Sequence, residues 1–396
     1  MNRRHRLDAV VAGGGVVGAC TALMLAREGL QVALVEPKRP PAWQPASRDL
    51  RVYAFAPDNA RLLDDLGVWQ PVLAARALPY RGMRVWDAAG GDALAFDADA
   101  LGQRQLGWIV ENTLLVDALW NALPAAGVRL HCPARIEAVE QSEAGVRLQL
   151  DDGVALDAKV AIAADGANSA LRGMAGIGTR KRDYAQKGLV AFVASGVPHR
   201  DTCWQRFLPT GPVAFLPFAD DGDVALAGRV GSIVWTLPDA EAERLRTADE
   251  AGFARELGDA FGGELGHMRL LSARAAFPLR RQLAETCVSG RVMLVGDAAH
   301  AVHPLAGQGV NLGLRDVVAL RELVRDAAKR GTDIASPQRL ARWARTRKSE
   351  NAVNALAFEA INRAYSNDAL WPTLLRGHAL GFAGKLPPLS RALWRH

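Results

Sequence analysis

The 396-residue chain has few cysteines, and no clean hydrophobic run in it is long enough to cross a membrane. Its four cysteines are scattered, and none forms a Cys-x-x-Cys pair. We therefore predict reduced cytoplasmic thiols and neither a zinc site nor a disulfide framework. Internal repeats and low-complexity segments are also lacking. A chain of this length suits two joined domains of a soluble globular protein.

A lysine-rich cluster with interleaved aromatic residues is missing as well, which argues against a nucleic-acid partner although the net charge is +6. The N-terminus has three arginines before an apolar run at residues 9–26, as a secretory signal has. Asp8 and four glycines interrupt that run, so we expect no signal peptide and a cytoplasmic protein.

A glycine-rich motif lies near the N-terminus between two apolar segments. The sequence predicts a strand over Leu7–Ala12, the turn Gly13–Gly18, a helix over Ala19–Glu28 and a strand over 31–35 that ends at Glu36. This is the order of a dinucleotide-binding unit. Gly13 permits the tight turn, Gly15 lets amides approach a pyrophosphate, and Gly18 lets helix and strand pack. Glu36 is placed to accept ribose hydroxyls. The motif alone does not separate NAD from FAD.

Two later segments also read as a buried strand followed by a polar turn. Residues 159–169 contain Asp165-Gly166, and residues 291–316 contain Gly296-Asp297. After the second turn, a loop leads to Gly309-Val310-Asn311, which opens a helix running to about Arg330. Apolar residues recur in that helix at steps of three and four, as a buried face requires.

With these motifs in this order, the chain resembles the class A flavoprotein monooxygenases, the group of para-hydroxybenzoate hydroxylase. The resemblance spans nearly the whole chain and implies an α/β fold: a Rossmann-like FAD-binding domain, an inserted mixed β-sheet substrate domain and C-terminal helices. It implies FAD as the cofactor, NAD(P)H as a transiently bound reductant and O2 as a substrate. The chain would be an FAD-dependent enzyme that hydroxylates an aromatic ring.

The resemblance also assigns roles to residues of this chain. Asp297 is expected to bind the ribityl chain, and Asp165 to support FAD and the entering nicotinamide. Arg51 matches an arginine that meets the FAD phosphates or the flavin. Asn112 starts a helix predicted over Asn112–Ala122 and stands where relatives often have glutamine. The complete predicted cofactor set is Gly13, Gly15, Val17, Gly18, Glu36, Arg51, Asn112, Asp165, Asp297, Gly307, Gly309, Val310 and Asn311.

Pro304 is predicted to line the flavin and substrate cavity with its carbonyl, and it is the one residue to which we assign a catalytic position. His300 and His303 could form a metal pair with Asp297, or a His–Asp relay. We favour a structural hydrogen-bonding role for these histidines in the flavin loop, and no metal.

The substrate domain is expected to be a sheet built from several short strand-like runs. By resemblance, Phe215 and Pro217 face the substrate. The predicted FAD-binding domain comprises residues 1–80, 103–182 and 277–335, and the substrate domain comprises residues 81–102 and 183–276. Residues 336–396 form a helical C-terminal region. The strand-like runs are 83–86, 94–96, 189–194, 205–208, 213–218 and 224–230.

Closer resemblance is to the ubiquinone-biosynthesis hydroxylases, in segments such as 49–52, 66–69 and 304–313. Tyr53, Phe55 and Asp58 depart from the small or serine residues usual in that subgroup. The implied substrate is a phenol or benzoquinol with a polyprenyl tail. Two alternatives remain: a hydroxylase of a small soluble phenol, and a non-catalytic flavin-binding subunit of a biosynthetic complex.

The end of the chain has no acidic residue after Asp368 but keeps four basic side chains and three large aromatic ones. This composition favours peripheral contact with the inner membrane face. We also expect association with a ubiquinone-biosynthesis complex. The residues concerned are Arg376, Lys385, Arg391, Arg395, Trp371, Phe382 and Trp394.

Overall fold

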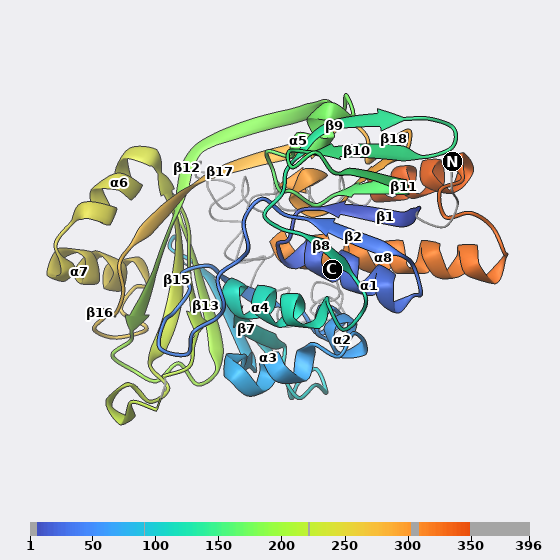
Figure 1. Cartoon of the computed structure of the whole chain (residues 1–396). Helices are drawn as coiled ribbons and strands as arrows, with labels where there is room; N and C mark the ends of the chain where they lie inside the picture. Colours follow the sequence, from blue (N-terminus) through green and yellow to red (C-terminus); the bar gives the residue numbers. More distant parts are fainter. Residues whose placement is uncertain (1–5, 91, 221, 302–308, 349–396) are drawn as a thin grey trace.

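The computed structural model describes residues 6–348 apart from 91, 221 and 302–308. Two large sheets lie side by side, each covered by its own helices (Figure 1). Within these residues, none of the helices combines the length and apolar character that a membrane span requires. The mixed α/β architecture that we predicted is confirmed.

The first sheet has eight strands, and its centre is parallel. β1 pairs in parallel with β2 on one side and with β11 on the other. The central strands β1 and β2 are almost completely buried, as is typical of parallel strands that are covered on both faces. α1 packs between this sheet, α4 and α8. The strands are β1 (Leu7–Ala12), β2 (Val32–Val35), β8 (Arg129–His131), β9 (Ile136–Gln141), β10 (Val146–Leu150), β11 (Ala155–Ala163), β18 (Val288–Ser289) and β19 (Val292–Leu294).

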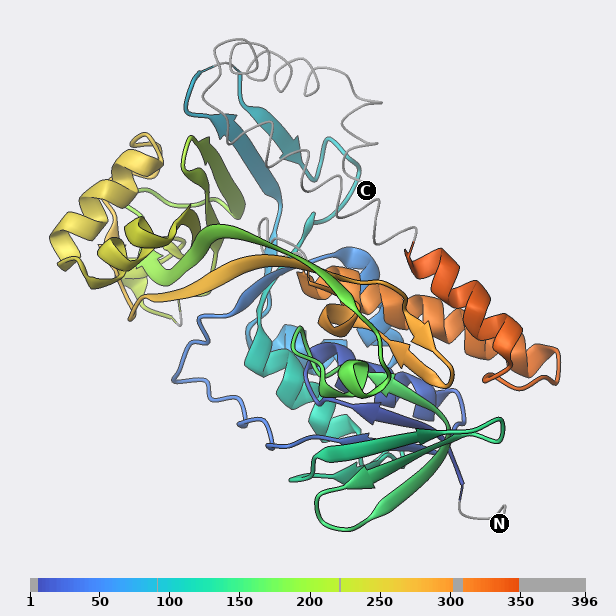
Figure 2. The ribbon, with the colours of Figure 1, turned by 90° about the horizontal axis from the view of Figure 1, so that it is seen from above.

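The second sheet has nine strands and is mostly antiparallel. Helices α6 and α7 cover its outer face, away from the first sheet (Figures 1 and 2). Its inner face packs on a three-stranded sheet. The nine strands are β5 (Gly82–Asp87), β6 (Leu94–Asp97), β12 (Thr179–Ala194), β13 (Thr202–Leu208), β14 (Gly211–Pro217), β15 (Val230–Pro238), β16 (Arg269–Leu270), β17 (Ala275–Ala284) and β20 (His300–Ala301); the smaller sheet has β3 (Val52–Phe55), β4 (Leu78–Tyr80) and β7 (Gly107–Glu111).

The eight-stranded sheet with its helices forms the first unit of the fold, and the nine-stranded sheet with its helices forms the second. Helix α4 begins and ends at the residues predicted for it. Short 3-10 turns occur at Val224–Leu226 and Gly296–Ala298. Residues 337–348 are helical as well. The labelled α-helices are α1 (Val16–Arg27), α2 (Pro57–Asp65), α3 (Trp69–Arg76), α4 (Asn112–Ala122), α5 (Ala170–Met174), α6 (Asp239–Thr247), α7 (Glu250–Ala260) and α8 (Gly309–Lys329).

Strands β12 and β17 join the two units. They pair with each other and run from the first unit into the second (Figure 1). The first half of β12 is charged, so a half-buried strand could not be recognised there from apolar alternation. The predicted domain boundaries at residues 182 and 277 lie inside these two strands rather than at the end of an element.

One predicted strand is wrong. Residues 224–230 contain a 3-10 turn, and the next strand begins only at Val230. The Asp223 carboxylate accepts a hydrogen bond from the Ala225 amide over 2.9 Å, which turns the chain. Val224 is therefore left 88% exposed, although its residue type favours a strand.

Candidate functional site

The glycine-rich turn connects β1 to α1 and packs against the end of β11. Gly13 has a φ of +100°, which disfavours any residue with a side chain. A Cβ on Gly13 would lie 2.5 Å from the Ala164 carbonyl oxygen, and a Cβ on Gly18 would collide with the Gly13 carbonyl. A Cβ on Gly15 would meet no protein atom within 4 Å. Only Gly15 therefore faces open space, as a glycine beside a bound group should.

The N-terminus of α1 opens beside Gly15. Its cap residue makes no side-chain hydrogen bond, and its first turn has no acidic residue. The first amides of a helix lack partners within the helix and give this end a partial positive charge. An anionic group can therefore bind here without displacing a protein carboxylate.

Glu36 ends β2 beside the same turn. Its Oε2 accepts a hydrogen bond from the Gly14 amide over 2.6 Å, and its Oε1 accepts one from the Lys38 amide over 3.2 Å. The indole Nε1 of Trp120 donates to the Gly14 carbonyl over 2.7 Å. Trp120 was not identified from the sequence because its buried position on α4 is that of an ordinary core residue.

The Asp165 turn follows β11 and lies against Gly13. Asp165 Oδ2 accepts a hydrogen bond from the Leu171 amide over 3.2 Å, while its Oδ1 is buried without a partner in the structure. Arg172, which the sequence analysis missed, donates to the carbonyls of Ala167 and Ala298 over 2.9 and 3.0 Å. It thereby joins the Asp-Gly turn to the Gly-Asp turn, and burial lowers its pKa.

The Gly-Asp turn meets the glycine-rich turn through Val17. A Cβ on Gly296 would lie 3.2 Å from Val17 Cγ1, and one on Gly313 would lie 2.6 Å from Val17 Cγ2. The side chain of Val17 therefore packs where these two glycines leave room. Its predicted cofactor contact is untested, but it does bring the first and third motifs together.

Asp297 presents its side chain to solvent, yet the protein around it desolvates the carboxyl and raises its pKa. The neighbouring His300 and Arg51 side chains oppose that rise. Accessible surface combined with strong desolvation is expected of a group in a concave part of the surface, where protein surrounds it without covering it. The Asp297 carboxylate is thus accessible, and its binding of a cofactor hydroxyl stays a prediction.

His300 does not pair with Asp297. Its Nε2 lies 2.6 Å from Oδ2 of Asp316, which also accepts a hydrogen bond from the Gly296 amide over 2.8 Å. Arg347 donates to Asp316 Oδ1 over 2.7 Å. All three side chains are almost completely buried. This network supports the structural role favoured for His300 and places Asp316 and Arg347 beneath the Gly-Asp turn.

Arg51 and Asn112 lie next to each other at the start of β3 and α4. The Asn112 amide donates to the Arg51 carbonyl over 2.9 Å, and the Arg51 amide donates to Asp49 Oδ1 over 2.9 Å. Asp49 Oδ2 also accepts from the Thr113 amide over 3.0 Å. The backbone of Arg51 is held on both sides while its side chain remains exposed.

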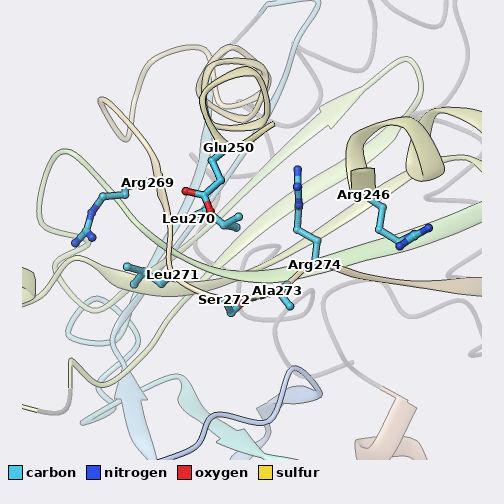
Figure 3. Close-up of a pocket in the computed structure, with 8 residues that line it drawn as sticks. All are labelled: Arg246, Glu250, Arg269, Leu270, Leu271, Ser272, Ala273 and Arg274. Atoms are coloured by element: carbon cyan, nitrogen blue, oxygen red, sulfur yellow. Dashed lines mark hydrogen bonds between the residues drawn. The ribbon is translucent and has the colours of Figure 1, made fainter. Parts of the chain in front are cut away.

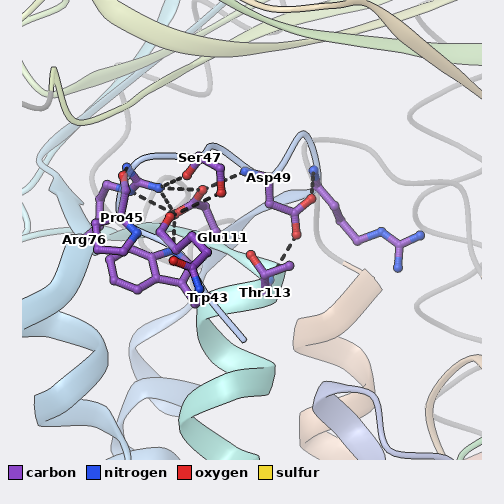
Figure 4. A network of polar contacts seen from close by, with 9 residues as sticks. Trp43, Pro45, Ser47, Asp49, Arg76, Glu111 and Thr113 are labelled. Atoms are coloured by element: carbon purple, nitrogen blue, oxygen red, sulfur yellow. Dashed lines mark hydrogen bonds and ion pairs between the residues drawn. The ribbon is translucent and has the colours of Figure 1, made fainter. Parts of the chain in front are cut away.

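A buried ion pair supports this segment from below (Figure 4). Arg76 on α3 and Glu111 at the end of β7 lie 2.9 Å apart, and both are nearly inaccessible. Glu111 Oε1 accepts from the Asp49 amide over 2.7 Å, and its Oε2 accepts from the Trp43 indole over 3.0 Å. The carboxylate therefore fixes the loop before Arg51, a role that no sequence motif indicated.

The start of α8 is attached to β3. Asn311 Nδ2 donates to the Ala54 carbonyl over 2.7 Å, and its Oδ1 accepts from the Ala56 amide over 3.1 Å. Gly309 would present a Cβ to open space, and Val310 is buried. The side chain of Asn311 is thus structural, which leaves the amides of the first turn of α8 for the predicted flavin contact. Pro304, Gly307 and His303 lie outside the described residues.

Phe215 is not on the face predicted for it. It packs with Phe261 and other residues of the cluster under α7, on the outer face of the nine-stranded sheet. Successive side chains of a strand alternate between faces. Leu216 and not Phe215 therefore belongs to the apolar cluster between the nine-stranded and three-stranded sheets, which we call the inner cluster. This corrects the prediction for Phe215. Pro217 is buried opposite Gly231, and the same alternation puts it on the face of Phe215, so its substrate role stays a prediction without support from the strand geometry.

An open groove of about 620 Å³ lies beside α7 and β16 in the second unit (Figure 3). Arginines and backbone from residues 269–274 line it. Arg274 is already bound to the Leu245 carbonyl over 2.8 Å, and Arg246 pairs with Glu243 over 2.7 Å. No predicted site residue lines the groove, so the convergence of the three motifs identifies the better site.

These residues fit FAD by their own geometry. Gly15 and the uncapped start of α1 accommodate a pyrophosphate, while Glu36 and Asp297 offer carboxylates to the hydroxyls of a ribose and of a ribityl chain. The three turns that carry these groups contact one another through Gly13, Val17 and Arg172.

Comparison with known proteins agrees with this geometry. Residues 6–352 match a family model described as FAD binding domain. The chain is 38% identical to the 3-demethoxyubiquinol 3-hydroxylase of Escherichia coli, over 91% of this chain and 90% of that protein. It is 36% identical to the ubiquinone hydroxylase UbiL of Rhodospirillum rubrum, over 98% and 89%. The solved structure of p-nitrophenol 4-monooxygenase from Pseudomonas putida matches 98% of this chain and 96% of that one with a TM-score of 0.76 at 21% identity.

Proposed function

Because the chain belongs to the FAD-binding family of class A flavin monooxygenases, we propose that it hydroxylates an aromatic ring in the pathway to ubiquinone, using NAD(P)H and O2. The observation that carries the proposal is the meeting of the three turns at Gly13, Asp165 and Gly296. Relatives named for ubiquinone hydroxylation match nearly the full chain. The protein is accordingly an FAD-dependent monooxygenase.

FAD, when bound, supplies the redox chemistry with NAD(P)H and O2. The chain's own residues bind and orient it. The first amides of α1 would hold the pyrophosphate beside Gly15, and Glu36 would accept a ribose hydroxyl while it fixes Gly14. Asp297 would bind the ribityl chain. The first amides of α8, at Val310 and Asn311, would stabilise negative charge on the flavin edge.

The substrate ring would lie between the cofactor and the inner face of the nine-stranded sheet. Apolar side chains dominate that face, where Leu216, Phe192 and Phe218 are buried against the three-stranded sheet. A dry wall excludes water from a reactive site. The polyprenyl tail expected on the substrate is strongly apolar, at about 0.8 kcal/mol for each CH2 removed from water.

The test is NADH and NADPH oxidation by purified holoprotein with tailed and tail-less phenols and benzoquinols, while product mass is followed under labelled O2. We expect a polyprenylated ring to stimulate turnover and to gain one labelled oxygen atom. Stimulation only by small soluble phenols would favour the first alternative substrate class. Absence of any substrate-stimulated turnover would favour a non-catalytic flavin subunit, and label found only in peroxide or water would contradict hydroxylation.

A tailed substrate also suggests where the protein acts. We propose that the segment after Asp368 makes peripheral contact with an anionic membrane and that the enzyme joins a ubiquinone-biosynthesis complex. Four basic side chains near such a surface contribute about 1 kcal/mol each, and the segment lies outside the described residues. Sedimentation with anionic liposomes tests it: salt-sensitive binding by the full chain, lost on truncation at Asp368, is expected. Equal binding by both forms would reject the membrane contact.

A further inference from the structure

Tyr53 lies where three predicted cofactor residues meet. It follows Arg51 by two residues on β3, and the carbonyl of the next residue, Ala54, binds the Asn311 side chain at the start of α8. Its hydroxyl donates to Asn112 Oδ1 over 3.0 Å.

The direction of the Tyr53 side chain follows from strand alternation. Val52 and Ala54 pack with the inner cluster beneath the nine-stranded sheet. Tyr53 and Phe55 point the other way and pack with the core of the first unit. Tyr53 therefore projects toward the unit that holds the glycine-rich turn and the Gly-Asp turn, and it keeps part of its surface accessible.

Both polar atoms of the Asn112 side chain lie near protein partners in this arrangement. Its Oδ1 accepts the Tyr53 proton, and its Nδ2 lies 3.5 Å from Asp49 Oδ2. A glutamine, one CH2 longer, could extend past these partners. The asparagine here holds the phenol instead. Because the Tyr53 proton goes to Asn112, the phenol oxygen acts as a hydrogen-bond acceptor. The Arg51 side chain donates one hydrogen bond to this oxygen, and its second lone pair remains for a further donor.

The charged side chains that influence the Tyr53 phenol include Arg51 and Asp297, which are both predicted cofactor residues. Desolvation raises the pKa of Tyr53 to about 12, with Arg51 lowering it and Asp297 and Asp49 raising it further. The phenol thus stays neutral at physiological pH. Tyr53 and Asp297 are distant in sequence, yet both are desolvated by the protein while some of their surface stays accessible.

We propose that Tyr53 contacts the bound FAD, accepting a hydrogen bond from a cofactor donor between Arg51 and Asp297, and that Asn112 acts only by positioning Tyr53. The inference rests on the proposed FAD site. It replaces the direct Asn112–FAD contact implied by the family resemblance with a contact made by Tyr53.

The experiment measures the FAD dissociation constant of apoprotein variants by titration, and the thermal unfolding of each apoprotein. Tyr53→Phe keeps the ring and removes the acceptor, so FAD affinity should fall about three- to tenfold, the range of one neutral hydrogen bond. Apoprotein melting should stay close to that of the unmodified chain. Tyr80→Phe is the matched control, since Tyr80 is buried on β4 of the same small sheet and belongs to the inner cluster. Its FAD affinity should not change.

A double-mutant cycle separates positioning from contact. If Asn112 acts through Tyr53, Asn112→Ala should lower FAD affinity no more than Tyr53→Phe does, and the double variant should match Tyr53→Phe within about twofold. If the two substitutions lower FAD affinity by factors that multiply in the double variant, the positioning role is overturned. If Tyr53→Phe leaves FAD affinity unchanged, the proposed contact is overturned. In either case, FAD binding by the unmodified chain leaves the proposed function standing. An unmodified chain that binds no FAD would overturn both.

Discussion

His300 Nε2 and Asp316 Oδ2 lie 2.6 Å apart, and each side chain exposes only 1% of its surface. The same carboxylate binds the Gly296 amide and the Arg347 guanidinium. One side chain of α8 therefore ties the Gly-Asp turn to the helix at residues 337–348. A buried carboxylate is tolerated only with such partners.

Removing this carboxylate should destabilise the protein strongly. In Asp316→Ala, the buried guanidinium of Arg347 loses its counter-charge and the Gly296 amide loses its acceptor. We expect a loss of about 3–5 kcal/mol in the free energy of unfolding, measured by urea denaturation of the apoprotein. Asp326→Ala is the matched control on the same helix, because its ion pairs with Arg330 and Arg339 are partly exposed. It should lose far less stability, because exposed ion pairs contribute little. Similar losses in the two variants would contradict this view of the network.

Two glycines of the same turn should respond differently to the same substitution. Gly18→Ala places a methyl group against the Gly13 carbonyl and should both destabilise the apoprotein and weaken FAD binding. Gly15→Ala meets no protein atom and has an ordinary φ of −69°. Its apoprotein should melt at or slightly above the unmodified temperature, yet FAD affinity should drop sharply because the methyl occupies the approach of the pyrophosphate. Normal FAD titration of Gly15→Ala would place the pyrophosphate elsewhere.

Glu36→Ala removes a carboxylate that holds Gly14 and is expected to bind a ribose hydroxyl. Charged hydrogen bonds contribute roughly 1.5–3 kcal/mol, so FAD affinity should fall about ten- to a hundredfold. Fluorescence titration of apoprotein with FAD measures the change. Glu137→Ala, at an exposed position on β9, serves as the control and should bind FAD normally. A curve for Glu36→Ala that overlays the control would exclude the assigned role.

Asp297 should make apoprotein stability depend on pH in a defined direction. Its folded-state pKa is raised by desolvation above the ordinary value of 3.8, so the folded state binds the proton more tightly than the unfolded state does. Ionisation therefore lowers stability as pH rises through the unfolded and then the folded pKa. Asp297→Asn cannot ionise. Its apoprotein should be more stable than the unmodified one at pH 7, and the difference should shrink as pH falls through the raised folded-state pKa and largely vanish below 3.8.

The same variant should bind FAD more weakly, as should Asp297→Ala, by roughly ten- to a hundredfold for a charged hydrogen bond. Greater apoprotein stability together with weaker cofactor binding is the expected pair of results. Urea denaturation across the pH range and FAD titration at pH 7 measure them. A pH-independent stability difference would show that Asp297 does not titrate as described.

Local sequence was sufficient for the elements around the glycine-rich turn. The strand at Leu7–Ala12 and the helix at Asn112–Ala122 have the predicted bounds, because the apolar patterns that mark them act within a few residues. Gly13 and Glu36 were assigned from spacing alone, and the structure places both at the same turn. The strand predicted at residues 224–230 was wrong because the turn at Asp223 overrides the β-propensity of valine and leucine.

By itself, the sequence determined the cofactor class and the order of the three motifs, since backbone geometry at glycines and the short range of helix termini are local properties. Only the tertiary structure decided what lies beneath and between those motifs. His300 pairs with Asp316 and not Asp297, and Phe215 faces α7. The Tyr53 hydroxyl donates a hydrogen bond to the amide oxygen of Asn112. Each of these depends on which face of an element turns inward and on partners up to hundreds of residues apart, which no local pattern encodes.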